Sequence, residues 1–382
     1  MAQLKIVYLI AEDWFFCSHF LDRAKAAREA GYEVTVVTRV SKHAEIIKEN
    51  GIFLAPVQFN RRGLNPCKEA KTIRQIYQVY RKLNPDLVHH IALKPILYGT
   101  LAAKWAGLTR VINAPVGMGF VFTSQKKLAQ CLRPFVQFFL KKLLNPPNSC
   151  IILENSDDRD FFANEGLAQY DDIALIKGAG VDLELFNCTA EPNGTPVVTL
   201  VARMLWDKGI KEFVEAARIL KSQKLNARFV LVGDPDIGNP GAIPIKTLHG
   251  WVDEGFVEWN GARSDIPEIL ANSHIVCLPS YREGLPKSLI EALASCRPVV
   301  TTDVPGCREV VTHRHNGLLV PARDTTALAK ALKELILSPE ARQEMGCKGR
   351  ARAIHEFSRE LVVEQTLAIY RHMLSRDAVK SV

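Results

Sequence analysis

Short apolar runs rich in Val, Ile and Leu alternate along the chain with longer segments whose apolar residues recur at helical spacing. Strands that alternate with helices indicate parallel sheets of the doubly wound α/β class. The pattern predicts two series of strands, with helices between them, notably at residues 20–30 and 68–83. The first series is 5–10, 33–38, 53–57, 87–89, 110–113 and 150–153, and the second is 197–201, 228–232, 257–259, 275–279, 298–302 and 317–320.

The two series predict two domains, in keeping with a length of 382 residues. A glycine-containing segment, residues 177–186, precedes a Pro/Gly/Asn-rich stretch that ends at Pro196, and we place the hinge there. We therefore expect one Rossmann-like domain over residues 1–180 and a second over 181–357, with the C-terminal helix of 358–382 packing back on the first. Ligands of such sheets bind at the carboxyl ends of the strands, so we expect a cleft with the two domains facing each other.

Composition and charge narrow the class of protein. Apolar residues make up 47% and charged residues 24%, which is typical of a folded soluble protein. The nine cysteines are scattered without a CxxC pair, so we expect reduced thiols and neither a zinc site nor a disulfide. The chain enters a strand without a signal peptide and has no apolar run long enough to cross a bilayer, which predicts a cytoplasmic protein. A net charge of +8 suits nucleic acid, an anionic membrane surface or phosphate-bearing small molecules.

The segment at residues 279–293 carries the strongest candidate chemistry. A strand ends at Pro279, a short loop follows, and a helix is predicted to begin near Pro286. The free N–H groups at a helix N-terminus form a natural seat for phosphate. Glu283 lies on the loop and Glu291 two turns along the helix, so both can reach a ligand at the helix mouth. Taken alone, two glutamates at this spacing are better explained as solvated surface residues without a role.

Three further segments strengthen that interpretation. The strand at 197–201 leads into Arg203 and Lys208, two cations that a diphosphate would meet at the strand end. The strand at 228–232 ends in Gly233 and Asp234. The loop at 261–266 precedes a predicted helix with an N-cap and could present backbone groups to a base. Each of these has an ordinary structural explanation when it is considered by itself.

In this order, the segments resemble retaining glycosyltransferase family 4 of the GT-B architecture, over nearly the whole chain and most closely over residues 197–321. Glu283 and Glu291 match its E-x7-E motif, and residues 304–309 and 316–320 match further motifs. The resemblance implies that Glu283 contacts the donor sugar, Glu291 the ribose, and Arg203 with Lys208 the diphosphate. The donor-binding residues that it implies are Arg203, Lys208, Gly233, Arg263, Ser264, Ile266, Glu283, Gly284, Leu285, Pro286 and Glu291.

The chemistry of the leaving group predicts that no metal or other cofactor is needed. A departing nucleoside diphosphate gains negative charge that has to be stabilised by a metal or by fixed cations. We expect no Asp-x-Asp motif at a strand end, and Arg203, Lys208 and the helix N-terminus near Pro286 supply positive charge instead. We therefore expect a metal-independent enzyme.

The first half of the chain resembles the family less closely. Residues 11–20 lack the Gly-Gly pair that members often carry in the loop after the first strand, although Ser18 or His19 could face the cleft. Of the two histidines at the strand end, we expect His90 to lie near the reacting sugar and His89 to be a packing residue, with a core position for His90 as the alternative. The acceptor-side candidates are Ser18, His19, Lys94, Gly117 and Gly119; the last three lie in stretches that match a subgroup of bacterial polysaccharide and lipid-linked oligosaccharide transferases.

A basic amphipathic helix is predicted at residues 126–144. Leu and Phe residues recur at helical spacing on one side, and Lys, Arg and Gln occupy the other. Aromatic side chains opposite a basic face suit an anionic membrane surface, while an ordinary core-packing helix explains the same pattern. Both interpretations stay open at this stage.

The sequence therefore predicts a retaining glycosyltransferase that moves an N-acetylhexosamine or a hexose from a UDP-sugar to a polyprenyl-diphosphate-linked saccharide. We expect it at the inner face of a bacterial plasma membrane, with front-face attack on the donor. Alternatives are a non-catalytic sugar-nucleotide sensor and a nucleotide-sugar epimerase of the same fold. An NAD-dependent oxidoreductase lacks its Gly-x-Gly-x-x-Gly after the first strand. The basic residues are spread out and form no recognised module, so no nucleic-acid partner is expected.

Overall fold

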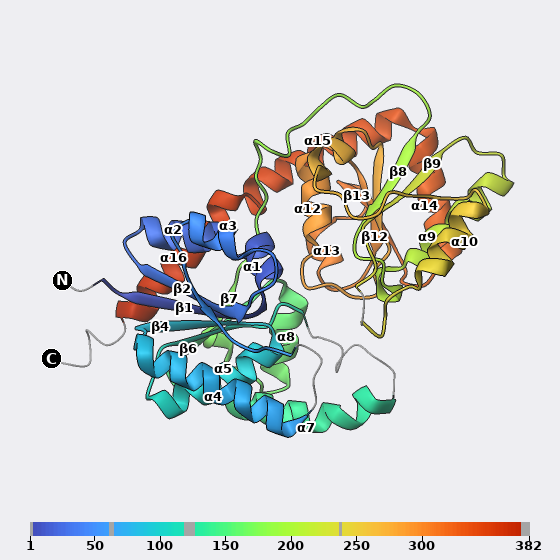
Figure 1. Ribbon diagram of the computed structural model, residues 1–382. Helices are drawn as coiled ribbons and strands as arrows, with labels where there is room; N and C mark the ends of the chain where they lie inside the picture. Colours follow the sequence, from blue (N-terminus) through green and yellow to red (C-terminus); the bar gives the residue numbers. More distant parts are fainter. Residues whose placement is uncertain (1–2, 61–64, 118–126, 237–238, 376–382) are drawn as a thin grey trace. The chain divides into compact units, whose positions relative to one another are not determined.

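The computed structural model describes residues 3–60, 65–117, 127–236 and 239–375, with the side chains of 127–132 left out. The chain forms two compact units (Figure 1). The N-terminal unit comprises residues 1–179 and 360–382, and the C-terminal unit comprises residues 180–359. Each unit is a parallel sheet with helices on its faces, so the predicted α/β class is confirmed.

The sheet of the N-terminal unit has the strand order β3-β2-β1-β4-β5-β6-β7. Six of its strands follow the hydrophobic pattern, whereas the three-residue β7 has no buried residue and was not predicted. The strands are β1 (Lys5–Glu12), β2 (Glu33–Arg39), β3 (Phe53–Pro56), β4 (Leu87–Ile91), β5 (Val111–Ala114), β6 (Ser149–Leu153) and β7 (Ile173–Leu175).

Alternate residues of each strand enter two different cores, because successive side chains point to opposite faces of a sheet. Tyr8 packs with α1, α2 and α16 on one face, and Val7 packs with α4 and α5 on the other (Figure 1). The C-terminal helix α16 thus belongs to the N-terminal unit through its buried Tyr370 and Met373. The helices are α1 (Asp13–His19), α2 (Leu21–Glu29), α3 (Ala44–Glu49), α4 (Pro66–Leu83), α5 (Leu93–Ala106), α7 (Lys127–Leu143), α8 (Ser156–Asn164), η1 (Tyr170–Asp172) and α16 (Arg359–Ser375).

The sheet of the C-terminal unit has the order β10-β9-β8-β11-β12-β13, which places β8 beside β9 and β11 at its centre. All six strands match the predicted series to within one residue at each end. They are β8 (Val197–Val201), β9 (Arg228–Val232), β10 (Glu258–Trp259), β11 (Ile275–Leu278), β12 (Val299–Thr302) and β13 (Gly317–Val320). The helices are η2 (Trp206–Lys208), α9 (Ile210–Ser222), α10 (Ile245–Asp253), α11 (Ile266–Ala271), α12 (Lys287–Ala294), α13 (Cys307–Val310), α14 (Thr325–Leu337) and α15 (Pro339–Glu356).

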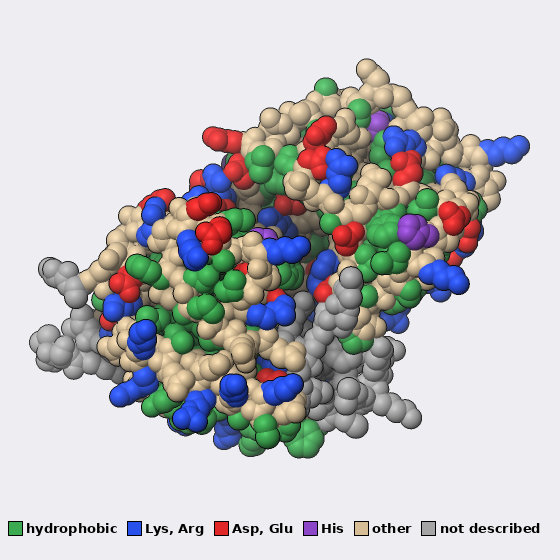
Figure 2. Space-filling view, viewed as in Figure 1, with side chains coloured by type: hydrophobic (Ala, Val, Ile, Leu, Met, Phe, Trp, Pro, Cys, Tyr) green, Lys and Arg blue, Asp and Glu red, His purple; other side chains and the backbone are tan. Residues whose placement is uncertain are grey.

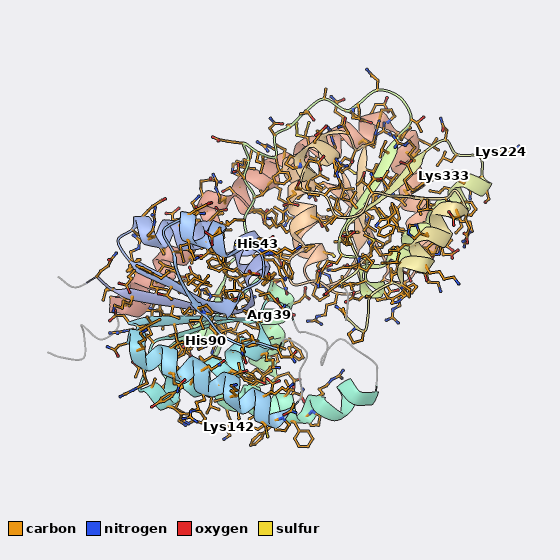
Figure 3. All side chains as sticks on the ribbon, viewed as in Figure 1. Arg39, His43, His90, Lys142, Lys224 and Lys333 are labelled. Atoms are coloured by element: carbon orange, nitrogen blue, oxygen red, sulfur yellow. A yellow bond between two sulfur atoms is a disulfide. The ribbon has the colours of Figure 1, made fainter. Side chains whose placement is uncertain are left out.

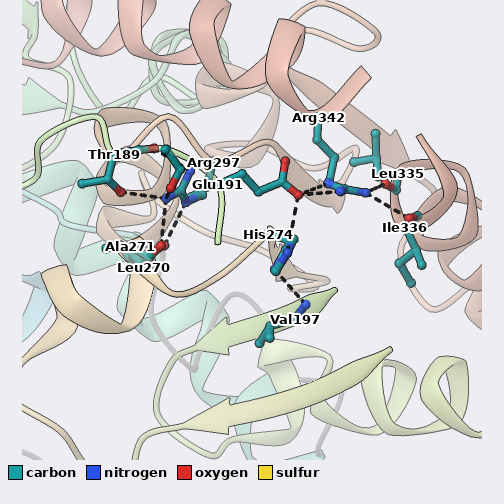
Figure 4. Close-up of polar contacts among 11 residues, drawn as sticks. Thr189, Glu191, Val197, Leu270, Ala271, His274, Arg297, Leu335, Ile336 and Arg342 are labelled. Carbon is teal, nitrogen blue, oxygen red and sulfur yellow. Dashed lines mark hydrogen bonds and ion pairs between the residues drawn. The ribbon is translucent and has the colours of Figure 1, made fainter. Parts of the chain in front are cut away.

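The Pro/Gly/Asn-rich stretch that ends at Pro196 is held within the C-terminal unit by hydrogen bonds and ion pairs (Figure 4). Arg297, which is buried, donates to the backbone oxygen of Thr189 at 3.1 Å and to that of Ala271 at 2.8 Å. Glu191 lies 2.5 Å from Arg342 and 3.6 Å from His274. Its composition is that of a linker, but the segment is part of the packed unit.

One cysteine pair contradicts the prediction that every thiol is reduced. Cys188, in the same stretch, forms a disulfide with Cys296, which follows the C-terminal end of α12. The two residues are 108 positions apart. Local Cys spacing cannot reveal a pair that only the fold brings together, and the CxxC criterion therefore missed it.

Candidate functional site

A lysine–glutamate pair lies where β8 and β11 end in the C-terminal unit. Lys208 Nζ donates to Glu283 Oε1 at 2.6 Å, and Ser280 Oγ donates to the same oxygen at 2.5 Å. Only 18% of the Lys208 side chain and 11% of the Glu283 side chain are exposed. The structure thus joins two predicted site residues and adds Ser280, which the sequence analysis missed although it lies three residues before Glu283.

Close backbone contacts fix the loops that carry this pair. Gly209, directly after Lys208, has a φ of 71°, and a Cβ there would lie 2.0 Å from the oxygen of Pro279. A Cβ on Gly306, whose φ is 80°, would lie 2.3 Å from the oxygen of Gly284. Only glycine combines these φ angles with such close approaches. Glu283 is therefore positioned by its neighbours before any ligand arrives.

The helix after this loop begins one residue later than predicted. Pro286 is the N-cap and Lys287 the first residue of α12, while Leu285 and Pro286 are buried beneath the loop. Glu291 is only 8% exposed and lies 3.5 Å from Lys287 Nζ. Burial raises the pKa of Glu291, and the charge of Lys287 offsets part of that rise. Lys287 was not among the predicted residues, although it is four positions before Glu291 on the same helix.

Arg203 is held by one carboxylate of an Asp-x-Asp motif, so the expectation that no such motif stands at a strand end is wrong. Asp234 and Asp236 form an Asp-x-Asp directly after β9, the kind of pattern often associated with a metal. Arg203 Nη1 lies 2.7 Å from Asp236 Oδ2, and Asp234 Oδ1 accepts from the N–H of Ala262 at 2.9 Å. Among the described residues, no group of three or more His, Cys, Asp or Glu could hold a metal ion. The two carboxylates serve here to hold Arg203 and the following loop.

The predicted base-binding loop is attached to the end of β9. Gly233 donates its N–H to the oxygen of Gly261 at 2.7 Å and accepts from Trp259 Nε1 at 2.8 Å. Arg263 and Ser264 are exposed beyond this contact, and Ile266 begins α11. The expected N-cap bond is absent, because Asp265 pairs with Arg263 Nε at 2.8 Å instead.

The stretch after β1 differs from the prediction in the N-terminal unit. Residues 13–19 form the helix α1 rather than a loop. Asp13 begins this helix and accepts from Ser41 N at 2.6 Å and from His43 N at 3.1 Å. Ser18 is exposed on the helix, and the half-buried ring of His19 lies tilted beside that of Phe15, with 4.2 Å between the ring centroids. A stretch without glycine can continue as a helix where a Gly-Gly pair would break it.

Both histidines of β4 are fully buried, so the structure does not bring His90 to an accessible surface. His90 Nδ1 lies 2.8 Å from Asn113 Oδ1, and its Nε2 lies 3.0 Å from the hydroxyl of Tyr80. Burial lowers the pKa of His90 to about 4, although its bond to Asn113 acts in the opposite direction. The ring of His90, which is labelled in Figure 3, lies against Tyr80 of α4 and Gly99 of α5.

His89 points to the other face of the sheet, as alternation requires. Its Nδ1 lies 2.8 Å from the hydroxyl of Tyr370, which donates to Tyr8 at 2.6 Å. Its Nε2 has no hydrogen-bond partner among the described residues. Burial lowers the pKa of His89 well below its usual value, and the nearby Arg23 charge lowers it further.

The other acceptor-side candidates are separate from the histidines. Lys94 Nζ donates to the oxygen of Asn60 at 2.6 Å and lies 2.9 Å from Glu69. Gly117 has a φ of 81° with nothing near its missing Cβ. Gly119 lies outside the described residues. The structure therefore does not gather the predicted acceptor residues into one cluster.

The predicted amphipathic helix is present as α7, which ends at Leu143. Leu140 and Leu144 are buried in the unit, as the core-packing interpretation requires. Three aromatic side chains remain outside, with Phe135 66%, Phe138 59% and Phe139 51% exposed. The core-packing interpretation is therefore confirmed for one side of the helix, whereas membrane contact through the exposed aromatic side stays a prediction.

Two doubly wound parallel sheets, with cations and a carboxylate at the strand ends of the second, define the GT-B class of glycosyltransferases. Comparison of the sequence gives the family: residues 5–152 match the family described as glycosyl transferase 4-like, and residues 182–352 match glycosyl transferases group 1. The chain belongs to this group 1 family and is a glycosyltransferase.

Two relatives illustrate the similarity. The chain is 31% identical over 363 residues to the N,N'-diacetylbacillosaminyl-diphospho-undecaprenol alpha-1,3-N-acetylgalactosaminyltransferase of Campylobacter jejuni, covering 92% of this chain and 94% of that protein. It is 26% identical to the UDP-Gal:alpha-D-GlcNAc-diphosphoundecaprenol alpha-1,3-galactosyltransferase of Escherichia coli, covering 71% of each. Their names describe transfer to undecaprenyl-diphosphate-linked acceptors.

Solved structures share the fold. Sucrose-phosphate synthase of Thermosynechococcus elongatus superimposes with a TM-score of 0.82 at 20% identity, covering 98% of this chain and all (100%) of that one. Anabaena HepE in complex with UDP-glucose gives a TM-score of 0.78 at 18% identity, covering 97% and 100%. Within the part of the chain that the structure describes, no helix is both long enough and apolar enough to span a bilayer.

Proposed function

We propose that this glycosyltransferase transfers an N-acetylhexosamine or a hexose, with retention, from a UDP-sugar to a polyprenyl-diphosphate-linked saccharide in bacterial surface-glycan synthesis. The observation that carries the proposal is the Lys208–Glu283–Ser280 arrangement at the carboxyl ends of β8 and β11. The names of the two relatives support the lipid-linked acceptor, and one of them names a UDP-sugar.

The donor diphosphate lies between Arg203 and Lys208 in this proposal. Each cation is already held by a carboxylate, Arg203 by Asp236 and Lys208 by Glu283. Pairing restricts the side chains beforehand, so a diphosphate meets oriented donors. Glu283 then accepts from hydroxyl groups of the donor sugar, and Glu291 accepts from the ribose.

Retention follows from attack on the same face that the diphosphate leaves. The bond between the anomeric carbon and the diphosphate oxygen breaks, and the acceptor oxygen forms its bond to that carbon. The acceptor proton passes to the departing diphosphate, so no protein nucleophile is needed. Arg203 and Lys208 stabilise the charge that develops on the diphosphate, which is the basis for proposing a metal-independent reaction.

The proposed location is the inner face of the plasma membrane, with α7 as the contact. Its exposed Phe135, Phe138 and Phe139 lie beside the exposed Lys141 and Lys142. Hydrophobic and basic side chains also lie together along the lower edge of the N-terminal unit in Figure 2. Aromatic groups enter the interface while lysines attract anionic headgroups.

A transfer screen tests the proposal. The purified chain is incubated in EDTA with UDP-, GDP- and ADP-sugars and a bacterial lipid extract, and both released nucleotide and labelled lipid are measured. We expect UDP release and a labelled lipid from one UDP-sugar, with the anomeric configuration of the donor. UDP binding without turnover would indicate a sensor, and absence of both would contradict the donor-site assignment.

A further inference from the structure

A basic pocket of about 720 Å³ opens in the N-terminal unit, beyond the carboxyl ends of β2 and β3 and against α4. Its size is that of an ordinary small-molecule site. It contains none of the acceptor-side residues predicted from the sequence. The residues that line it are Arg39, Val40, Pro56, Val57, Gln58, Phe59, Asn60, Lys68, Lys71, Thr72 and Gln75.

Three cations and no carboxylate are among these lining residues. Lys68 and Lys71 are exposed, lie one turn apart on α4, and have no ion-pair partner among the described residues. Like charges at this spacing repel each other, so a bound anion relieves an unfavourable contact. Arg39, 52% exposed at the end of β2, is paired with Glu12 at 2.5 Å (Figure 3).

The position of the pocket adds to its positive potential. The first turn of α4, an 18-residue helix, carries Lys68, and the Asn65 side chain caps that end by accepting from Cys67 N and Lys68 N. The N-terminal end of a helix is the positive end of its dipole. Carboxyl ends of parallel strands are also the usual ligand position in such sheets.

One wall of the pocket is apolar and firmly held. Val57 and Phe59 are buried, and Val40 and Pro56 continue the wall. Thr72 Oγ1 donates to the oxygen of Gln58 at 2.8 Å, and the N–H of Gln58 donates to Gln75 Oε1 at 3.2 Å. A site with cations beside fixed hydrocarbon suits an amphiphilic anion better than a bare phosphate.

From this combination we infer that the pocket binds the diphosphate of the prenyl-diphosphate-linked acceptor, with the first isoprene unit on the Val57–Phe59 wall. The inference rests on the proposed function and names the subsite for one part of its acceptor. Lys68, Lys71 and Arg39 contact the diphosphate, while the saccharide extends out of the pocket.

Calorimetric titration of the full chain tests the subsite, with geranyl diphosphate, geraniol and inorganic diphosphate as probes. We expect geranyl diphosphate to bind more tightly than either of the others. Lys68→Gln combined with Lys71→Gln should weaken it by about 10-fold or more, because two charge-assisted contacts are lost. The same pair of substitutions should raise KM for the lipid-linked acceptor and leave kcat and UDP-sugar hydrolysis within about twofold.

Lys82→Gln is the matched control, since Lys82 is exposed on the same helix and lies outside the pocket. It should bind all three probes as the unchanged chain does. Equal affinity for inorganic and geranyl diphosphate would overturn the lipid assignment, and unchanged binding in the Lys68/Lys71 variant would overturn the subsite. A further outcome is that the unchanged chain releases no nucleotide from any UDP-sugar, while the Lys68/Lys71 variant still binds geranyl diphosphate more weakly than the unchanged chain does. In that case the proposed function fails and the subsite stands.

Discussion

The two units use the same architecture but arrange their reactive side chains differently. In the C-terminal unit, Lys208 at the end of η2 and Glu283 on the loop after β11 bond directly to each other. In the N-terminal unit, His89 and His90 lie inside the sheet itself and are fully buried, while the cations of the basic pocket stand apart at its surface. The C-terminal unit thus has a bonded polar pair at its strand ends, whereas the N-terminal unit has exposed cations at its surface and buried polar side chains in its interior.

The two units differ in this way because, among the described residues, close backbone contacts at glycines fix the loops of only one of them. Gly209 and Gly306 allow loop backbones of the C-terminal unit to approach within distances that no side chain permits. Such contacts fix the loops with little freedom for alternative positions. In the N-terminal unit the corresponding stretch after β1 is a helix. We expect donor binding to be sensitive to small backbone changes and acceptor binding to be sensitive mainly to surface charge.

The largest effect is expected for Glu283→Gln. The substitution keeps the shape but removes the charge that Lys208 contacts and that the proposed function assigns to the sugar hydroxyls, so kcat should fall by roughly 10²–10³-fold. Steady-state transfer assays measure the loss. Glu258→Gln, which alters an exposed carboxylate paired with Arg228 on the same sheet, should change kcat little. An equal fall of kcat in both variants would contradict a specific role of Glu283 in transfer.

Comparison of Gly306→Ala with Gly255→Ala separates the cost of a left-handed backbone conformation from the cost of a steric clash with neighbouring backbone. Their φ angles are 80° and 75°, but a Cβ at 306 meets Gly284 O at 2.3 Å and one at 255 meets nothing within 4 Å. Gly255→Ala should cost about 1 kcal/mol of unfolding free energy, and Gly306→Ala about 1–3 kcal/mol more. Urea denaturation gives the energies, and UDP titration should show a loss of affinity for Gly306→Ala alone. Similar behaviour of the two variants would contradict the proposed locking.

Acid should destabilise the N-terminal unit through its buried histidines. The folded pKa of His90 is about 4, against about 6.5 in the unfolded chain, so only the unfolded state gains this proton between those values. Stability is therefore retained above about pH 6.5 and lost as the pH falls towards 4, by about 2 kcal/mol for His90 at pH 5.

Urea unfolding at pH 7 and pH 5 measures this loss. The His90→Gln variant should lose less stability over the same interval, because glutamine does not titrate. If His90→Gln loses as much unfolding free energy between pH 7 and pH 5 as the unchanged chain does, His90 is not held neutral in the folded chain.

The smallest effect is expected at α7. Phe138→Ser with Lys142→Gln should weaken sedimentation with vesicles of anionic lipid, because it removes one exposed ring and about 1 kcal/mol of attraction from one cation. Turnover with a short, water-soluble acceptor should stay unchanged. Phe53→Ser with Lys48→Gln is the control, since Phe53 is 62% exposed on β3. Equal loss in the control pair would contradict a specific role for α7.

The sequence predicted the strands well because burial on both faces of a parallel sheet leaves nearly continuous apolar runs. It also predicted that Lys208 and Glu283 belong to one site, since strand ends of a doubly wound sheet meet at one edge. The short β7 and the helix α1 were missed because three half-buried residues, or a stretch simply lacking glycine, give no distinct pattern.

Contacts between segments that are distant in the sequence could not be predicted from local sequence patterns. Neither the Cys188–Cys296 disulfide nor the pairing of Arg203 with Asp236 follows from local spacing. The environment of His90 depends on Tyr80 and Asn113, which lie on other elements. The basic pocket likewise combines β2, β3 and α4, whose lysines taken alone are indistinguishable from solvated surface residues.

Titration of UDP into the unchanged chain, Lys208→Gln and Lys224→Gln tests the central claim most directly. Lys224 is an exposed lysine of the same unit and stands apart at its periphery in Figure 3. The account predicts that Lys208→Gln weakens UDP binding by about 10–100-fold through loss of a charge-assisted contact, while Lys224→Gln binds normally. Normal UDP affinity in a folded Lys208→Gln variant would contradict the assignment of the donor site to the strand ends of the C-terminal unit.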